Sequence, residues 1–171
     1  NLKIIDCLFE KEQTLEDAID LIKNNPSSRR IIIDIWNCST LDKASLPPCL
    51  CKYQFNVNQL DKKLNLMIYI RSSDFFLANN WNVCTGAFLV HMICNLNGIE
   101  LTPGILTVVT GDTHLYLTHI EGVNKNLERT PKPYPKLIVK NKKDNIEDFE
   151  YSDMIILGYK PYPNIPAKMA I

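Results

Sequence analysis

The spacing of hydrophobic and polar residues along the chain predicts three helices. Residues 14–23 place their apolar side chains on one helical face, and Thr14 with Asp17 forms the pattern of a capping box. Residues 81–95 contain few helix breakers and repeat apolar positions at helical spacing, which predicts a largely buried helix. A third helix is expected from His119 to about Arg129.

Shorter apolar or alternating runs predict strands. The expected strands are residues 31–36, 53–57, 64–70, 105–110, 136–140 and 154–157. The run 31–36 is almost entirely apolar, so we expect both of its faces to be covered. A polar turn around residues 58–61 predicts that the strands on either side of it pair. The chain shows no repeat and no linker, and this order of elements predicts one α+β domain over residues 1–171, built on a mixed sheet.

Composition and charge exclude several classes. The 171 residues carry nineteen basic and nineteen acidic side chains and a net charge of zero, which indicates neither nucleic-acid binding nor attraction to a membrane surface. No apolar run approaches the length of about eighteen residues that spans a bilayer. The first residues do not resemble a signal peptide. Six scattered cysteines in a chain of this size indicate a reducing, cytoplasmic compartment, and their spacing does not match a metal site.

Several polar residues are candidates for chemistry. Pro47 and Pro48 stiffen the chain before Cys49, so the Cys49 thiol is either a positioned nucleophile or a small buried hydrophobe. Arg29 and Arg30 precede a strand, where an arginine pair is either solvated surface or a phosphate ligand. The strand 64–70 ends in Arg71, Ser72, Ser73 and Asp74, and after the strand 105–110 His114 and Tyr116 alternate onto one face. His91 on the second helix is expected to be a core histidine.

Taken together, these segments resemble the thymidylate synthase family. The motifs that carry the resemblance occur in family order and spacing: NPSSRRIIIDIWN, LPPC followed by QF, RSSD, GDTHLY, PKPYPKLIVK and GYKPYP. They cover most of the chain from Thr14 to Ile171. The resemblance implies a thymidylate synthase-like fold, with a large mixed sheet that carries helices on one face and stacks back to back in a twofold homodimer. It also implies methyl transfer to carbon 5 of deoxyuridylate (dUMP), with 5,10-methylenetetrahydrofolate as carbon donor and reductant and with no metal.

The resemblance also implies roles for individual residues. Cys49 matches the thiolate that adds to carbon 6 of uracil, and Asn82 matches the asparagine that recognises uracil. The residues that match phosphate ligands are Arg71 and Ser72 of the same subunit and Arg29 and Arg30, which reach the partner's site. His114 and Tyr116 match the pair that binds the deoxyribose 3′-hydroxyl. Asp74 matches the carboxylate that contacts both the pterin and the nucleotide through a hydrogen-bond network. Trp81 replaces the family's residue but can present an aromatic face to the aminobenzoyl ring of the folate, and Ala170 matches part of a C-terminal lid over the folate.

The chain departs from the family pattern around the reacting ring. Leu50 stands where the family has histidine, Ile70 where it has glutamine, and Ala78 to Trp81 replace the residues before the uracil-binding asparagine. An N-terminal part of the family's catalytic core, with an arginine loop and folate-side residues, has no counterpart in these 171 residues. We therefore expect either a fragment of a longer protein or the loss of part of the site.

Three functions are consistent with this pattern. The first is thymidylate synthase. The second is a deoxyuridylate hydroxymethylase, in which water replaces the hydride and which the changes at Leu50 and Ile70 favour. The third is a weakly active or inactive family member that serves as a nucleotide-binding or structural subunit. The presence of Cys49, Asn82, His114 and Tyr116 favours the enzymes.

Overall fold

The structure is a computed structural model that describes residues 13–169. Its α-helices are α2 (Leu15–Asn24), α3 (Asn79–Cys94) and α4 (Ile120–Leu127). Its strands are β1 (Ile32–Asp34), β2 (Leu50–Asn58), β3 (Lys63–Asp74), β4 (Thr102–His114), β5 (Lys136–Val139) and β6 (Met154–Leu157). Single turns of 3₁₀-helix cover Leu41–Lys43, Leu117–His119, Ile146–Asp148 and Tyr151–Asp153.

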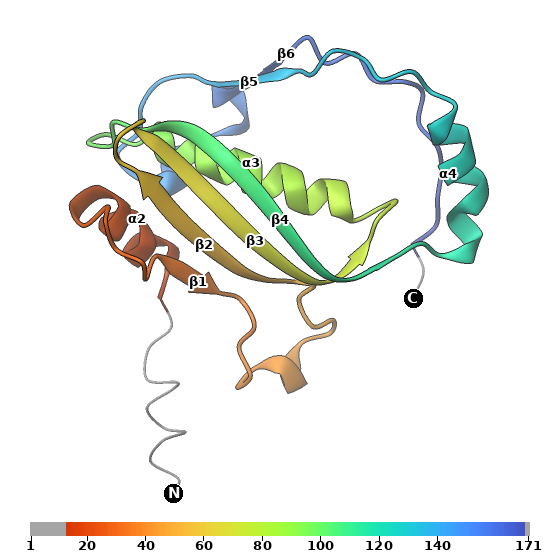
Figure 1. The fold of residues 1–171 in the computed structure, drawn as a ribbon, viewed down its shortest axis with the longest axis horizontal. Coiled ribbons are helices and arrows are strands. Elements are labelled where there is room, and N and C mark those ends of the chain that lie inside the picture. The colour runs from red at the N-terminus through yellow and green to blue at the C-terminus, as the bar shows by residue number, and fades with distance from the viewer. Residues whose placement is uncertain (1–12, 170–171) are drawn as a thin grey trace, which may run out of the picture.

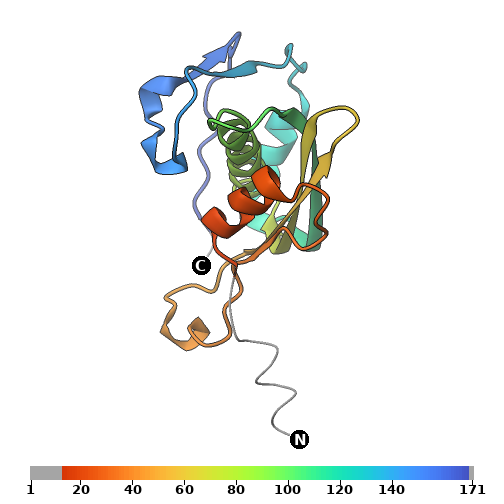
Figure 2. The same cartoon turned by 90° about the vertical axis from the view of Figure 1, so that its left-hand side faces the viewer.

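A four-stranded mixed sheet forms the centre of the fold. The strand order is β1-β2-β3-β4, in which β1–β2 and β2–β3 are antiparallel and β3–β4 is parallel. Helix α3 supplies the crossover between the two parallel strands and packs on the sheet (Figure 1). The side view shows α2 and α3 on the same side of the sheet, while no described element covers the other side (Figure 2). The expected α+β fold, with helices on one face of a mixed sheet, is confirmed.

The core lies between this sheet and the two helices. Alternate residues of β3 point into it, and they are fully buried: Leu64, Leu66, Ile68 and Ile70. The intervening residues Met67 and Tyr69 face the uncovered side and are partly exposed. Helix α2 begins at the expected capping box, in which the Asp17 amide donates to Thr14 Oγ1 at 3.1 Å and the Thr14 amide donates to the Asp17 carboxylate at 3.1 Å.

Two predictions about strands need correction. The strand expected at 31–36 has only three residues, Ile32–Asp34, and it is not covered on both faces, because Ile32 and Ile33 are only half-buried and Asp34 is exposed. An all-apolar run is therefore not sufficient evidence for a central strand, and β1 is an edge strand with one partner. The strands β2, β3 and β4 are all longer than expected, so that Arg71 to Asp74 and Gly111 to His114 belong to strands.

The last third of the chain lies around this core. Strands β5 and β6 form a separate antiparallel pair, and the tail 158–169, which is irregular as expected, runs beside α4 (Figure 1). Among residues 13–169, no helix has both the length and the apolar character needed to cross a membrane.

Candidate active site

One end of the sheet gathers most of the candidate residues. Because β2 is antiparallel to β3, the beginning of β2 lies beside the end of β3, and the Arg71 amide donates to the Cys49 carbonyl at 2.8 Å. Because β4 is parallel to β3, its end lies there too, and the register pairs Ser72 with Asp112 and Asp74 with His114. The strand directions thus bring together residues that are up to 65 positions apart in sequence.

Arg71 holds the corner that carries Cys49. Its Nε donates to the Pro48 carbonyl at 2.9 Å, and an Nη donates to the Pro47 carbonyl at 3.0 Å. Its guanidinium also lies over the Trp36 ring, 5.1 Å from the ring centre. A guanidinium has five N–H donors, so three remain for a ligand after these two bonds. Arg71 therefore fixes the two residues that precede the half-buried Cys49.

A β-bulge at Cys51 completes the corner. The register between β2 and β3 shifts between Leu50 and Lys52, which leaves Cys51 as the extra residue. The buried Cys51 Sγ lies 3.6 Å from the Cys49 carbonyl oxygen. The bulge and the two prolines together turn the chain sharply before the regular ladder begins.

The two departures from the family pattern lie opposite each other. Leu50 and Ile70 are Cα partners across β2 and β3, directly beside the Cys49 corner. Ile70 is fully buried and Leu50 packs against the same core. Opposed side chains of a sheet interact directly, so an apolar pair stands where the family has a polar pair. The two changes are complementary because either polar residue alone would face an apolar partner.

Asp74 caps the chain as it turns from β3 into α3. Its Oδ1 accepts from the amides of Phe76 and Leu77 at 3.1 and 3.2 Å. Its Oδ2 accepts no hydrogen bond within residues 13–169. The neighbouring Ser73 is fully buried and donates to Asn79 Oδ1 at 3.2 Å, which ties the first turn of α3 to the end of β3. This bond fixes the turn of helix that carries Asn82.

Three aromatic side chains at and just after the end of β4 contact one another edge-on. His114 lies edge-on to Tyr116 with ring centres 5.0 Å apart, and Tyr116 lies edge-on to His119 at 5.6 Å. His114 Nδ1 also lies 3.0 Å from Asp112 Oδ1, which orients its imidazole. His114 and Tyr116, which were expected to share a ligand, are thus in contact with each other.

The structure does not bring Arg29 and Arg30 to this end. Both are exposed and precede Ile31, the residue before β1, and the Ile31 carbonyl accepts a backbone hydrogen bond from Phe55 at 2.9 Å. Phe55 is six residues along β2 from Cys49, which corresponds to about 20 Å of extended strand. The arginine pair therefore lies near the opposite end of the sheet in its own subunit.

Trp81 lies at the mouth of a groove of about 610 Å³ between α3 and the β5–β6 pair. Its indole is 76% exposed. The groove walls are largely apolar and include Phe88, Leu137 and Ile156. Ala170, the remaining expected folate contact, lies outside the described residues.

The other cysteines of the described chain differ from Cys49 in their surroundings. Burial raises the pKa of the Cys94 thiol to about 12, so Cys94 stays protonated and unreactive. Cys51 is buried in the bulge, while Cys38 and Cys84 are exposed. His91 of α3 is only half-buried and lines the groove that Trp81 borders, rather than lying in the core as expected, and burial lowers its pKa.

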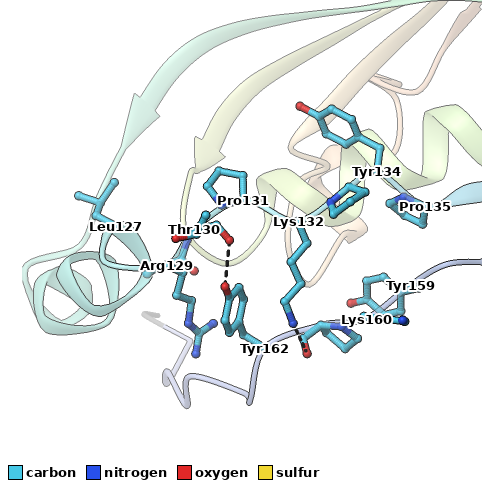
Figure 3. A pocket seen from close by; sticks show the side chains of 13 residues that line it. Leu127, Arg129, Thr130, Pro131, Lys132, Tyr134, Pro135, Tyr159, Lys160 and Tyr162 are labelled. Carbon is cyan, nitrogen blue, oxygen red and sulfur yellow. Dashed lines mark hydrogen bonds between the residues drawn. The ribbon is translucent and has the colours of Figure 1, made fainter.

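The tail is held by a cluster of basic and aromatic residues. Arg129 and Lys132 both lie over the Tyr162 ring, and Tyr162 donates its hydroxyl hydrogen to the Thr130 carbonyl at 3.0 Å (Figure 3). An Nη of Arg129 also donates to the Pro163 carbonyl at 2.6 Å. These contacts join the segments PKPYP and GYKPYP, and they direct the tail towards the end of the sheet.

Sequence reasoning missed Trp36, Asn79 and His119. Trp36 supports Arg71 from a loop, Asn79 bonds Ser73, and His119 is a buried histidine next to Asp74. Only for His119 did the sequence contain a usable signal, because this histidine closely follows the candidate site residues His114 and Tyr116. The supporting roles of Trp36 and Asn79 depend on contacts that no local pattern encodes.

The chain was compared with known proteins. The family described as "Thymidylate synthase" matches residues 9–171. A protein named thymidylate synthase from Mycoplasma mobile is 42% identical over 163 residues, which cover 95% of this chain. The chain spans 55% of the length of that relative.

The pairing of Leu50 with Ile70 leads to a prediction about stability. Ile70→Gln should lower the free energy of unfolding by about 2–4 kcal/mol, because it places an unpaired amide at a fully buried position. In the double variant with Leu50→His, the loss should be about 0.5–3 kcal/mol smaller than the sum of the single losses. Urea unfolding of the four proteins measures this coupling. Leu60→His, in an exposed turn, is the control, and additive losses would show that the pair does not interact.

Proposed function

This chain belongs to the thymidylate synthase family, and from that premise we propose that it converts dUMP to thymidylate with methylenetetrahydrofolate. The observation that supports the proposal best is the corner at Cys49, where the half-buried cysteine follows two prolines whose carbonyls accept from the Arg71 guanidinium. These two bonds fix the main chain immediately before the thiol.

The proposed chemistry begins with Cys49. Its sulfur forms a bond to carbon 6 of the uracil ring, and the electrons of the carbon 5–carbon 6 double bond move towards the carbonyl at carbon 4. Carbon 5 thereby becomes the nucleophile that attacks the one-carbon unit, and later loss of the proton from carbon 5 with expulsion of the Cys49 thiolate from carbon 6 breaks the adduct. The reduced folate supplies that unit and, in the synthase reaction, the hydride. A rigid corner favours the first step because rate depends on the alignment of the sulfur with its target.

The same end of the sheet offers contacts for the rest of dUMP. The three remaining donors of Arg71 and the Ser72 hydroxyl suit a phosphate. His114 and Tyr116, oriented by Asp112 and by each other, suit the deoxyribose 3′-hydroxyl. Asn82, on the turn of α3 that Ser73 secures, carries an amide that can both donate to and accept from uracil.

The residues on the folate side fit a reduced folate. The Asp74 Oδ2 atom is free to accept from the N–H groups of a pterin, and it is fixed because Oδ1 caps the following turn. The exposed indole of Trp81 borders an apolar groove that suits the aminobenzoyl ring. Ala170 is proposed as a further contact.

A deoxyuridylate hydroxymethylase is the second candidate. The observation in its favour is the Leu50–Ile70 pair, because the family's polar residues at these positions order water near the uracil ring. An inactive or weakly active family member is the third candidate, and the experiment described next can identify it. The free thiols of the described chain also favour a reducing cytoplasm as its location.

Product analysis tests these proposals. The full polypeptide incubated with dUMP and methylenetetrahydrofolate should yield thymidylate and dihydrofolate, and Cys49→Ser should reduce the rate at least roughly a thousandfold. Chromatography identifies the nucleotide, and dihydrofolate absorbance follows the folate. Cys38→Ser is the matched control, since this thiol is exposed and is not among the proposed site residues.

Each alternative result of that assay would reject one of the proposals. Hydroxymethyldeoxyuridylate with tetrahydrofolate would replace the synthase by the hydroxymethylase. Binding of dUMP without either product would reject both enzymes. A fully active Cys49→Ser variant would reject the nucleophile.

We also propose that the uncovered face of the sheet forms a twofold dimer. The apolar residues on that face include Tyr69, Val109 and Ile105, which are 38%, 43% and 70% exposed. Adjacent exposed apolar side chains on one sheet face are characteristic of an interaction surface. The position of Arg29 and Arg30 far from their own Cys49 supports a role at the partner's phosphate site. Each active site would then require both subunits.

A charge on this face should separate the subunits. Val109→Asp should convert a dimer into a monomer in analytical ultracentrifugation, because a buried unpaired carboxylate opposes association. Leu60→Asp, in the exposed turn between β2 and β3, should leave the mass unchanged. A wild-type chain that sediments as a monomer, or a dimeric Val109→Asp variant, would contradict the proposed interface.

A further inference from the structure

The Arg71 guanidinium uses only one of its two hydrogen-bonding edges within residues 13–169. Nε and Nη2 donate to the carbonyls of Pro48 and Pro47 at 2.9 and 3.0 Å, and these two nitrogens form one edge of the planar group. Nη1 and the second hydrogen of Nη2 form the other edge, which no described residue accepts from. No carboxylate of the described chain forms an ion pair with Arg71 either. The free edge therefore presents two parallel N–H groups that suit two oxygens of one phosphate.

The two hydrogen bonds alone do not fix the direction of this free edge. A planar group held at two points can still rock about the line that joins them, because carbonyl oxygens accept hydrogen bonds over a broad range of directions. A third contact away from that line opposes the rocking. Trp36 supplies such a contact, since Arg71 Cζ lies over its ring, 5.1 Å from the ring centre. Attraction between the cation and the aromatic face holds the contact together.

The main chain of Trp36 is itself attached to the pair of strands β1 and β2. The amide of the preceding residue, Ile35, donates to the Cys51 carbonyl at 2.8 Å. The Trp36 amide donates to Asp34 Oδ1 at 3.2 Å, and Asp34 Oδ2 lies 3.2 Å from Lys52 Nζ. The indole ring is therefore carried by a fixed main chain, so it can act as a support for the guanidinium.

The loop between Trp36 and the two prolines projects from the end of the sheet (Figure 1). In the described chain, the hydrogen bonds of residues 37–46 all stay within residues 35–46. Trp36 at the start of the loop and Pro47 and Pro48 at its end contact the same guanidinium. Arg71 thus joins both ends of the loop, and loss of the Trp36 ring would leave its side chain bound at one end only.

We propose that Trp36 is a positioning residue that holds the free edge of the Arg71 guanidinium in the orientation that receives the phosphate of dUMP. Trp36 acts through Arg71, because its ring restrains the guanidinium against rocking about the two proline carbonyls. The inference rests on the proposed function for the identity of the ligand, whereas the restraint on Arg71 exists without a ligand.

The motion of the guanidinium tests this restraint in the free protein. Relaxation of the Arg71 ¹⁵Nε nucleus gives an order parameter, for which about 0.85 indicates a rigid group and values below about 0.6 a flexible one. Wild type and Trp36→Phe, which keeps an aromatic face, should lie near the rigid value, and Trp36→Leu should fall below about 0.6. The signal is assigned by its absence from Arg71→Lys. An unchanged order parameter in Trp36→Leu would overturn the proposal.

Binding of dUMP to the full polypeptide tests the functional part. Trp36→Leu should raise the Kd for dUMP in titration calorimetry about tenfold, and Trp36→Phe should raise it less than about threefold. Tyr151→Leu is the matched control, because it removes a ring that is 96% exposed and should bind dUMP as wild type does. Equal binding by wild type and Trp36→Leu would show that the orientation of Arg71 does not serve the phosphate, and would overturn the functional part.

A double-mutant cycle separates the orientation of Arg71 from general damage to the loop. Arg71→Lys keeps the charge but has no fork to orient, so in this background Trp36→Leu should raise the Kd for dUMP less than about twofold. A tenfold loss in both backgrounds, with all variants folded by circular dichroism, would overturn the action through Arg71. A wild type that does not bind dUMP would reject the proposed function and the ligand named here, while the order parameters would still decide whether Trp36 restrains Arg71.

Discussion

The hydrogen bonds of Arg71 to Pro47 and Pro48 are the constraint on which the candidate site depends. They attach a loop of irregular structure to the end of a regular strand, and a guanidinium fork is well suited to two carbonyls in fixed positions. Trp36 supports the guanidinium from the side. Without this attachment, the Arg71 amide would still donate to the Cys49 carbonyl, but the two prolines before Cys49 would lose their side-chain contact with β3.

The sheet connects the Cys49 corner to the other residues of the candidate site. The bulge at Cys51 and the Leu50–Ile70 pair define one boundary, and Asp74 with His114 defines the other. From there, His119 connects the end of the sheet to the tail, which is also attached through Tyr162, Pro163 and Ile165. The strands thus position the residues proposed to bind the nucleotide, and side-chain contacts position the tail.

Sequence reasoning predicted what local patterns and family motifs encode. The capping box at Thr14, the hairpin of β2 and β3, and the α+β class followed from spacing alone. The strand at 31–36 was overestimated because apolar residues indicate burial without indicating how many neighbours a strand has. The ends of β3 and β4 were missed because cross-strand hydrogen bonds extend them through polar residues. The Arg71 fork and the His119 contacts join residues that are 23 to 49 positions apart, and no pattern along the chain reports them.

The central claim is that Cys49 meets the nucleotide on a corner that Arg71 holds. Alkylation by iodoacetamide, followed cysteine by cysteine with mass spectrometry, tests it most directly. In wild type, dUMP should slow alkylation of Cys49 while Cys38 and Cys84 react as before. In Arg71→Lys, which keeps the charge but loses the fork, this protection should be lost. Unchanged alkylation of Cys49 in the presence of dUMP, or equal protection in both proteins, would contradict the account.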